Sequence, residues 1–161
     1  MPKPKLAFTF NAIKNFSFPQ ANPGKKDIVY LHAALKKLRQ DIASEEVNRN
    51  ELGKTTKVAI LKFQKQAGLK ADGTLSPETV EKIKEELEHV YYGGSKTRTG
   101  KIQGMLERLG QKVDPEDIKS RTFGTSTEKA IRQFQKKVGL PDDGRLNENV
   151  ANKLNEEALK A

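Results

Sequence analysis

The 161-residue chain contains no cysteine and no tryptophan, and its two histidines are His32 and His89. Without cysteine it can form no disulfide, no thiolate metal site and no cysteine nucleophile. Two histidines without companion ligands at suitable spacing do not supply the three side chains that hold a catalytic zinc ion. The sequence therefore predicts no metal site and no cofactor.

Long apolar runs are also missing from the sequence. No stretch approaches the roughly 20 apolar residues needed to cross a bilayer, so we expect no membrane span. The first residues are basic, but they lack the apolar core and the small-residue cleavage site of a signal peptide. The chain is therefore cytoplasmic, or it has lost a signal, or it is exported by another route.

Sequence signatures of catalysis are absent as well. The acidic residues lie in runs that look solvated, such as Glu85-Glu86, rather than as an isolated pair of carboxylates. We find no nucleophilic serine motif, phosphate-binding loop or dinucleotide fingerprint. Two Asp-Gly turns do not fit a calcium-binding loop, because the positions that need carboxylates hold Gly68, Lys70 and Thr79 in one turn and Gly139, Pro141 and Val150 in the other. We expect a protein that is not an enzyme.

The charge is strongly basic but unevenly distributed. The net charge of +9 divides into +5 for residues 1–26, zero for residues 27–90 and +4 for residues 91–161. Such a balance attracts anionic polymers. Cell-wall polymers, nucleic acids and anionic membranes all qualify, so the sign of the charge does not choose among them.

What the sequence does contain is a long internal repeat. Residues 53–75 read GKTTKVAILKFQKQAGLKADGTL, and residues 124–146 read GTSTEKAIRQFQKKVGLPDDGRL. Twelve identities recur in the same order, always 71 positions apart. A constant period with unchanged internal spacing indicates a duplicated structural unit.

Each repeated position has a physical role. Ala59, Ile60 and Phe63, like their counterparts 71 positions later, fall at the spacing of one helix face. We expect Thr55 or Thr56, and Thr125 or Ser126, to cap the start of these helices. Gly68 and Gly139 stand where a helix ends in a left-handed residue. The Asp-Gly dipeptides predict turns, and Ser76-Pro77 predicts the start of the next helix.

The remaining segments complete an all-α prediction of two tandem three-helix bundles. We assign residues 27–90 to the first bundle, residues 91–99 to a flexible Gly-Gly-Ser linker and residues 100–161 to the second bundle. The first bundle starts with a helix over residues 27–40, and short helical turns at residues 44–48 and 115–120 lie in surface-exposed links. Residues 1–26 form an extended or hairpin segment, because Leu6, Phe8 and Phe10 alternate with other residues, as do Phe16 and Phe18.

The repeat closely resembles the peptidoglycan-binding-like domain found beside the catalytic domains of bacterial wall hydrolases. The resemblance covers residues 27–161. Its motif reads Gly53-x-x-Thr56-x-x-Ala59-Ile60-x-x-Phe63-Gln64-x-x-x-Gly68-Leu69-x-x-Asp72-Gly73, and it recurs from Gly124 to Gly144. Two positions depart from the family pattern. The second copy has Val150 in place of the threonine at Thr79, and the first copy has His32 in place of the glutamine at Gln103.

The resemblance implies a non-catalytic module that attaches to peptidoglycan, through its stem peptides or its glycan, as a monomer in the periplasm or at the cell wall. Duplication would raise avidity, and the parent protein would carry a catalytic or toxin domain. Candidate ligand-binding residues are the polar groups of the repeat and nearby cations: Gln64, Asp72, Arg98, Lys101, Arg121, Gln135 and Asp143. For the two glutamines, a structural role that holds the following turn is the leading alternative.

Two other functions stay open at this stage. A module that binds another protein or acts as a structural spacer could keep the fold without the wall ligand. A nucleic-acid-binding protein would suit the sequence pI of about 9.6. No helix clusters Arg, Asn and Gln as a recognition helix would, so nucleic acid is the weaker alternative.

Overall fold

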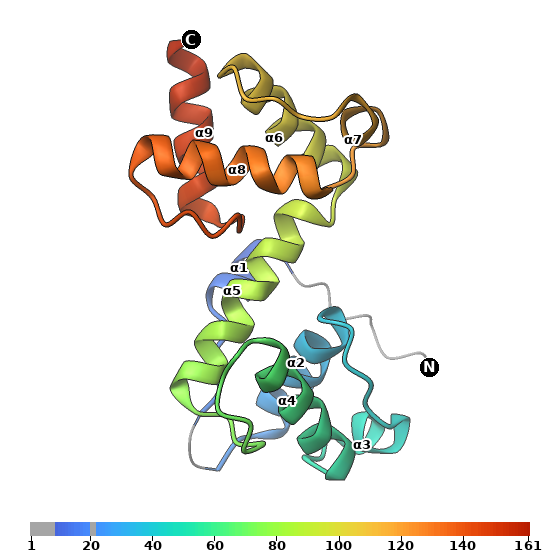
Figure 1. The fold of residues 1–161 in the computed structure, drawn as a ribbon. Helices are drawn as coiled ribbons and strands as arrows, with labels where there is room; N and C mark the ends of the chain where they lie inside the picture. The colour runs from blue at the N-terminus through green and yellow to red at the C-terminus, as the bar shows by residue number, and fades with distance from the viewer. Residues whose placement is uncertain (1–8, 20–21) are drawn as a thin grey trace. The chain divides into compact units, whose positions relative to one another are not determined.

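The computed structural model describes residues 9–19 and 22–161, and among these residues all regular structure is helical (Figure 1). The predicted all-α class is therefore confirmed. The chain divides into unit 1, Met1–Leu87, and unit 2, Glu88–Ala161. No helix in the described part of the chain is long and apolar enough to cross a membrane.

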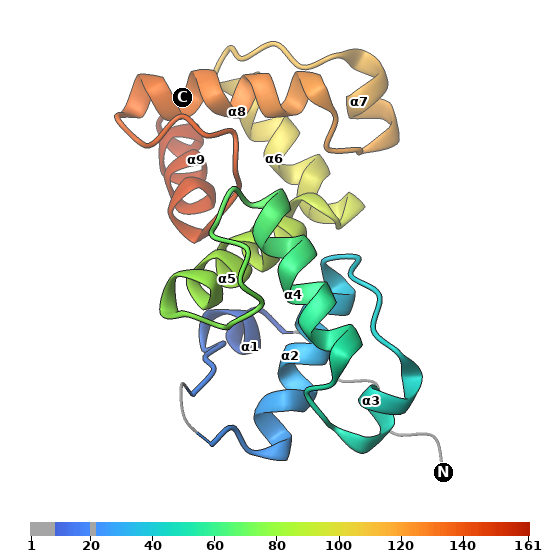
Figure 2. The same ribbon diagram turned by 60° about the horizontal axis from the view of Figure 1, so that its bottom comes forward.

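Unit 1 is built on three main helices and two short ones (Figures 1 and 2). Its elements are α1 (Phe10–Lys14), α2 (Lys25–Lys37), α3 (Ser44–Arg49), α4 (Lys54–Gln66) and the first part of α5 (Pro77–Gly93). The apolar stripes of α2, α4 and α5 face inward, so that Leu31, Leu35, Phe63, Ile83 and Leu87 are buried. The predicted helical turn in the link between the first two main helices is α3.

Unit 2 repeats this plan with α6 (Lys96–Arg108), α7 (Pro115–Ser120), α8 (Thr125–Val138) and α9 (Glu148–Lys160). Helix α6 contacts α7, α8 and α9. The core is a single cluster of buried apolar side chains that includes Leu106, Ile131, Phe134, Leu146 and Leu154. The predicted short turn over residues 115–120 coincides with α7.

The amino-terminal segment differs from the predicted hairpin. Leu6 and Phe8 lie outside the described residues, but residues 10–14 form the helix α1 instead of a strand. The Thr9 hydroxyl caps this helix by accepting a hydrogen bond from the Ala12 amide at 3.2 Å. Ile13 and Phe16 are both buried. Their three-residue spacing suits one face of a helical turn. The chain buries these two side chains instead of forming the strand that the alternation of Phe16 and Phe18 predicts.

The predicted linker over residues 91–99 is mostly helical. Helix α5 continues to Gly93, and Ser95 caps α6 by accepting from the Arg98 amide at 3.4 Å. The buried Thr99 hydroxyl lies 3.1 Å from the Gly93 carbonyl and 3.3 Å from the Tyr92 carbonyl, and so hydrogen-bonds the end of α5. The carbonyls of Tyr92 and Gly93 at the end of α5 therefore have a hydrogen-bond donor from α6. Gly-Gly-Ser forms a tight connection between the two helices, because in a flexible linker these carbonyls would be exposed.

We expect the two units to unfold separately when one core is damaged. Phe134 is buried in unit 2, and truncating a buried Phe to Ala costs about 3–5 kcal/mol, a large part of the stability of so small a domain. Phe134→Ala should therefore unfold unit 2 and leave unit 1 folded, whereas Phe63→Ala should do the reverse. Amide chemical shifts report each unit, and the loss of both units in either variant would contradict separate cores.

Candidate functional site

A buried glutamine on α4 holds the Asp-Gly turn of unit 1. Gln64 is 1% exposed, and its Nε2 lies 2.8 Å from the Thr74 carbonyl and 3.1 Å from the Thr79 hydroxyl. The same amide nitrogen approaches Asp72 Oδ1 at 3.2 Å, while Gln64 Oε1 accepts from the Gly73 amide at 2.9 Å. Both ends of the side chain therefore stabilise the turn.

Unit 2 has the same arrangement around Gln135. Its Nε2 donates to Asp143 Oδ1 at 2.9 Å and to the Arg145 carbonyl at 3.1 Å, and its Oε1 accepts from the Gly144 amide at 2.9 Å. Val150 stands where unit 1 has Thr79, so the hydroxyl acceptor is lost in this copy. The structure thus places the four predicted polar residues of the two turns in a structural role.

The start of α4 is capped by a carboxylate from α3. Glu46 accepts hydrogen bonds from the Thr55 amide at 2.8 Å, from the Thr56 amide at 2.9 Å and from the Thr56 hydroxyl at 2.6 Å. The predicted threonine caps are wrong, because Gly53 is the N-cap residue. A Cβ on Gly53 would meet the Glu46 carboxyl at 2.4 Å, so glycine leaves the space that the capping carboxylate fills.

The same cap occurs in unit 2, 71 positions later. Gly124 is the N-cap of α8, and Asp117 on α7 accepts a hydrogen bond from the Ser126 hydroxyl. A Cβ on Gly124 would meet the Asp117 carboxyl. The links that carry α3 and α7 therefore each place a carboxylate at the start of the central helix of their unit, and in unit 1 this carboxylate accepts from the helix amides.

A third repeated contact explains the departure from the family pattern at His32. His32 Nε2 lies 2.9 Å from the Thr56 hydroxyl, whose own proton goes to Glu46, so the imidazole donates this bond. In unit 2, Gln103 Nε2 donates to the Thr127 hydroxyl at 3.0 Å. All four side chains are buried. Histidine therefore replaces glutamine as the donor to the same buried threonine.

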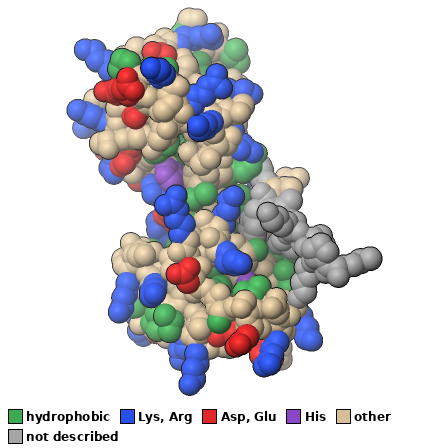
Figure 3. Space-filling view, turned by 90° about the vertical axis from the view of Figure 1, so that its right-hand side faces the viewer, with side chains coloured by type: hydrophobic (Ala, Val, Ile, Leu, Met, Phe, Trp, Pro, Cys, Tyr) green, Lys and Arg blue, Asp and Glu red, His purple; other side chains and the backbone are tan. Residues whose placement is uncertain are grey.

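The three predicted cations lie on and beside α6. The Arg98 guanidinium stacks 3.6 Å above the Tyr91 ring, a cation–π contact. Lys101 is exposed. Arg121, a left-handed residue at the end of α7, lies so close to Gly100 that a Cβ there would meet its Cδ at 3.2 Å. Elsewhere on the face shown in Figure 3 the basic side chains are scattered and interrupted by other surface.

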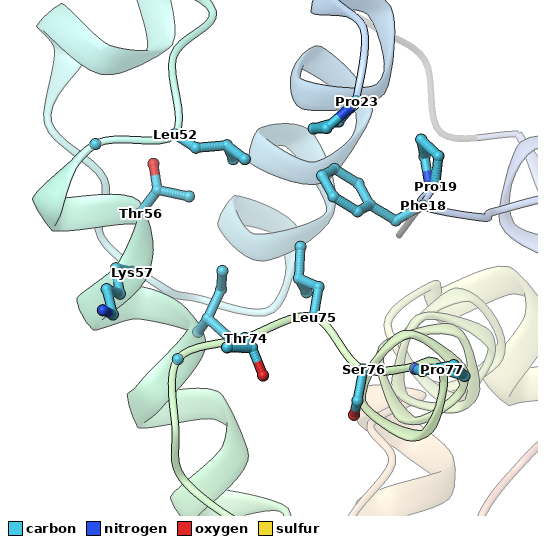
Figure 4. Close-up of a pocket in the computed structure, with 13 residues that line it drawn as sticks. Phe18, Pro19, Pro23, Leu52, Thr56, Lys57, Thr74, Leu75, Ser76 and Pro77 are labelled. Atoms are coloured by element: carbon cyan, nitrogen blue, oxygen red, sulfur yellow. The ribbon is translucent and has the colours of Figure 1, made fainter. Parts of the chain in front are cut away.

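A candidate binding site is a groove in unit 1 with a volume of about 530 Å³ (Figure 4). Its walls come from the amino-terminal segment, the start of α4 and the loop that follows the Asp-Gly turn. The side chains of Phe18, Leu52 and Leu75 extend toward the same space from these three segments. Leu52 is 45% exposed. We call this cavity the unit 1 groove; it is further lined by Pro19, Pro23, Gly53, Thr56, Lys57, Ile60, Gly73, Thr74, Ser76 and Pro77.

The corresponding position in unit 2 is filled by the last turns of α5. His89 Nδ1 accepts a hydrogen bond from the Leu146 amide at 3.0 Å. Its ring meets Phe123 edge-on, with 5.0 Å between the ring centres. Leu146 is fully buried, whereas its counterpart Leu75 is half-buried. The same backbone therefore makes an open groove in unit 1 and a closed one in unit 2.

The described residues hold no group of three or more His, Asp or Glu side chains placed to bind a metal ion. Burial lowers the pKa of His89, although Glu128 and Asp143 oppose this effect. A neutral imidazole is the form that can accept a hydrogen bond from a backbone amide through Nδ1. The unit 1 groove is thus suited to binding through polar groups and apolar walls rather than through a metal ion.

Comparison with known families gives one match, which occurs twice. The model of the family described as "Putative peptidoglycan binding domain" matches residues 25–83 and again residues 95–154. The chain belongs to this family. Searches among curated proteins and among solved structures give no match. Each peptidoglycan binding domain falls within one unit, with a buried glutamine on its central helix and a carboxylate beside the N-cap glycine of that helix.

Two pairs of residues at equivalent positions in the two units were not singled out from the sequence. The capping pair Glu46 and Asp117 is spaced by 71, and so are the groove residues Phe18 and His89. Neither pair is identical in residue type, so a search for identities passes over them. Comparing positions at the repeat period would have found both, because equivalent sites in a duplicated fold need not keep the same side chain.

Removing one buried glutamine should destabilise its own unit. Gln135→Ala leaves the Gly144 amide and the Arg145 carbonyl without their partner, which costs about 1–3 kcal/mol for a buried polar group. Gln133→Ala is the matched control, because Gln133 is exposed on the same helix. Chemical denaturation, followed by the amide shifts of unit 2, measures the stability of both variants. Equal stability would show that the hydrogen bonds of Gln135 to the turn are dispensable.

Acid should weaken the cap of α4. Burial alone would raise the pKa of Glu46, but hydrogen bonds from Thr56 and Thr55 outweigh it and lower the pKa to about 2. A carboxyl with a depressed folded pKa stabilises the fold above its unfolded pKa and loses that contribution as pH falls through the folded value. Unit 1 should therefore lose stability between about pH 5 and pH 2.

Glu46→Gln should reduce this dependence and lower the stability of unit 1 at neutral pH, because the amide has no charge to titrate. Glu45→Gln is the control, since Glu45 is exposed on the same helix. Thermal denaturation as a function of pH measures both variants. If the Glu46→Gln variant lost stability between about pH 5 and pH 2 as the parent does, the capping role of Glu46 would be contradicted.

Proposed function

We propose that this chain is a non-catalytic module that attaches to the peptidoglycan of the bacterial cell wall. The observation that carries the proposal is the tandem family match, which assigns a peptidoglycan binding domain to each unit. The unit 1 groove supports it, because it combines exposed apolar side chains with backbone polar groups in a cavity of suitable size for part of a wall polymer.

In this proposal the chain holds a larger exported protein at the wall, in the periplasm or on the cell surface. A catalytic or toxin domain is the expected partner, because a binding module of this kind raises the local concentration of whatever is attached to it. The basic residues add long-range attraction to anionic wall polymers rather than a specific site. No helix clusters Arg, Asn and Gln as a nucleic-acid recognition helix would, so nucleic acid stays the weaker alternative.

The proposal is tested by sedimentation of the full chain with purified sacculi. We expect the protein to enter the pellet with sacculi and to stay in the supernatant without them. A duplex DNA fragment at the same salt concentration should not retain it. Equal pelleting with and without sacculi would favour the spacer function, and release of muropeptides above a buffer control would overturn the non-catalytic assignment.

Two matched variants connect retention to the unit 1 groove. Leu52→Ser removes an exposed apolar side chain that lines the groove, and Val58→Ser removes one of similar exposure on α4 that does not line it. We expect about tenfold weaker retention for Leu52→Ser, as for the loss of one well-placed apolar contact. Val58→Ser should bind as the parent does. Equal retention of the two variants would place the wall site elsewhere.

A further inference from the structure

The two units present the same backbone donor in different surroundings. In unit 2 the Leu146 amide donates to His89, and in unit 1 the equivalent residue, Leu75, lines the groove. We infer that the unit 1 groove binds the stem peptide of peptidoglycan. An amide carbonyl of this peptide accepts a hydrogen bond from the Leu75 amide, as His89 does from the Leu146 amide in unit 2. Unit 2 is then closed by its own side chain. This inference rests on the proposed function.

The contact in unit 2 shows what this position accepts. His89 offers a neutral acceptor, Nδ1, 3.0 Å from the Leu146 amide, and a flat ring against Phe123. Leu146 itself is fully buried in the core of unit 2. An acceptor held beside an apolar body is therefore the chemistry that fits this position.

Unit 1 lacks that acceptor. The residue 71 positions before His89 is Phe18, which lines the groove but carries no ring nitrogen. Among the described residues the Leu75 amide has no hydrogen-bond partner. A half-buried donor without a partner gains a hydrogen bond when a carbonyl arrives. Leu52 and Ile60 supply the apolar walls that an amide with a short aliphatic substituent would contact.

An amide carbonyl occurs both in the N-acetyl groups of the glycan and in the stem peptide, and local charge selects the peptide. Lys57 lies over Gly73 at the groove, with its Cγ 2.9 Å from where a glycine Cβ would be. Its counterpart in unit 2 is Glu128, which pairs with Arg132 at 3.0 Å. A stem peptide carries carboxylates and the N-acetyl glycan chain does not, so a lysine at the groove favours the peptide in unit 1.

The test is an amide chemical-shift titration of the full chain with two probes. The first is the synthetic stem tetrapeptide L-Ala-γ-D-Glu-L-Lys-D-Ala, and the second is tri-N-acetylchitotriose. The tetrapeptide should shift the amides of Leu75, Gly73 and Thr74 and leave that of Leu146 in place. A shift of Leu75 by the trisaccharide instead would overturn the assignment to the peptide.

Substitutions in both units distinguish a side chain that occupies the binding position from one that only perturbs the structure. Phe18→His should supply the missing acceptor to Leu75 and weaken tetrapeptide binding about tenfold, the upper range for one competing hydrogen bond. Phe18→Leu is its control, because it adds no acceptor and should weaken binding less. His89→Ala should free Leu146, whose amide then shifts with tetrapeptide, more strongly when combined with Glu128→Lys.

The outcomes distinguish this inference from the proposed function. If sacculi retain the chain but the tetrapeptide does not shift Leu75, the groove assignment is wrong and wall binding stands. If Phe18→His binds the tetrapeptide as well as Phe18→Leu does, the acceptor role at Leu75 is wrong. If neither probe binds and sacculi do not retain the chain, both the inference and the proposed function fail.

Discussion

The buried glutamine on the central helix of each unit is the contact on which the rest of the structure depends. Gln64 and Gln135 each hold the following turn through the glycine amide and through carbonyl and carboxylate acceptors. Fixing this turn sets the path of the next residues, and the backbone amides of Leu75 and Leu146 take their positions from it. The buried side-chain amide is thus a structural group, and in unit 1 it sets the shape of the loop that lines the groove. A polar group in a core has this effect because it is stable in only one arrangement of its partners.

Duplication has kept the scaffold and changed the groove. The contacts that fix each unit are equivalent: a buried glutamine, a carboxylate over an N-cap glycine, and a donor to a buried threonine. The positions that face the groove differ, with Phe18 replaced by His89 and Lys57 replaced by Glu128. The scaffold positions tolerate few substitutions, because each buried polar group needs its hydrogen-bond partner. Groove positions are free to diverge, and in this chain one copy is open while the other is filled by its own histidine.

Much of the fold follows from local sequence. The repeat, the apolar faces that contain Phe63 and Phe134, and the left-handed glycines at 68 and 139 were all predicted and are confirmed. The predictions that were wrong depend on contacts from outside the segment. The alternation near Phe16 suggested a strand, but residues 10–14 form a short helix, and Ile13 on this helix and Phe16 just after it are buried. Thr55 was expected to cap α4, but the cap comes from Glu46, nine residues earlier.

The sequence by itself determined the duplicated all-helical fold and the family, because periodicity and turn residues act over short distances and are read directly from residue order. Only the tertiary structure decided what the repeated polar residues contact and where a groove forms. For Gln64 and Asp72 the sequence left both a structural and a ligand-binding role open, and in the fold they bond to each other. The groove combines residues from three separate segments, and whether it is open depends on which side chain a distant helix or segment places there.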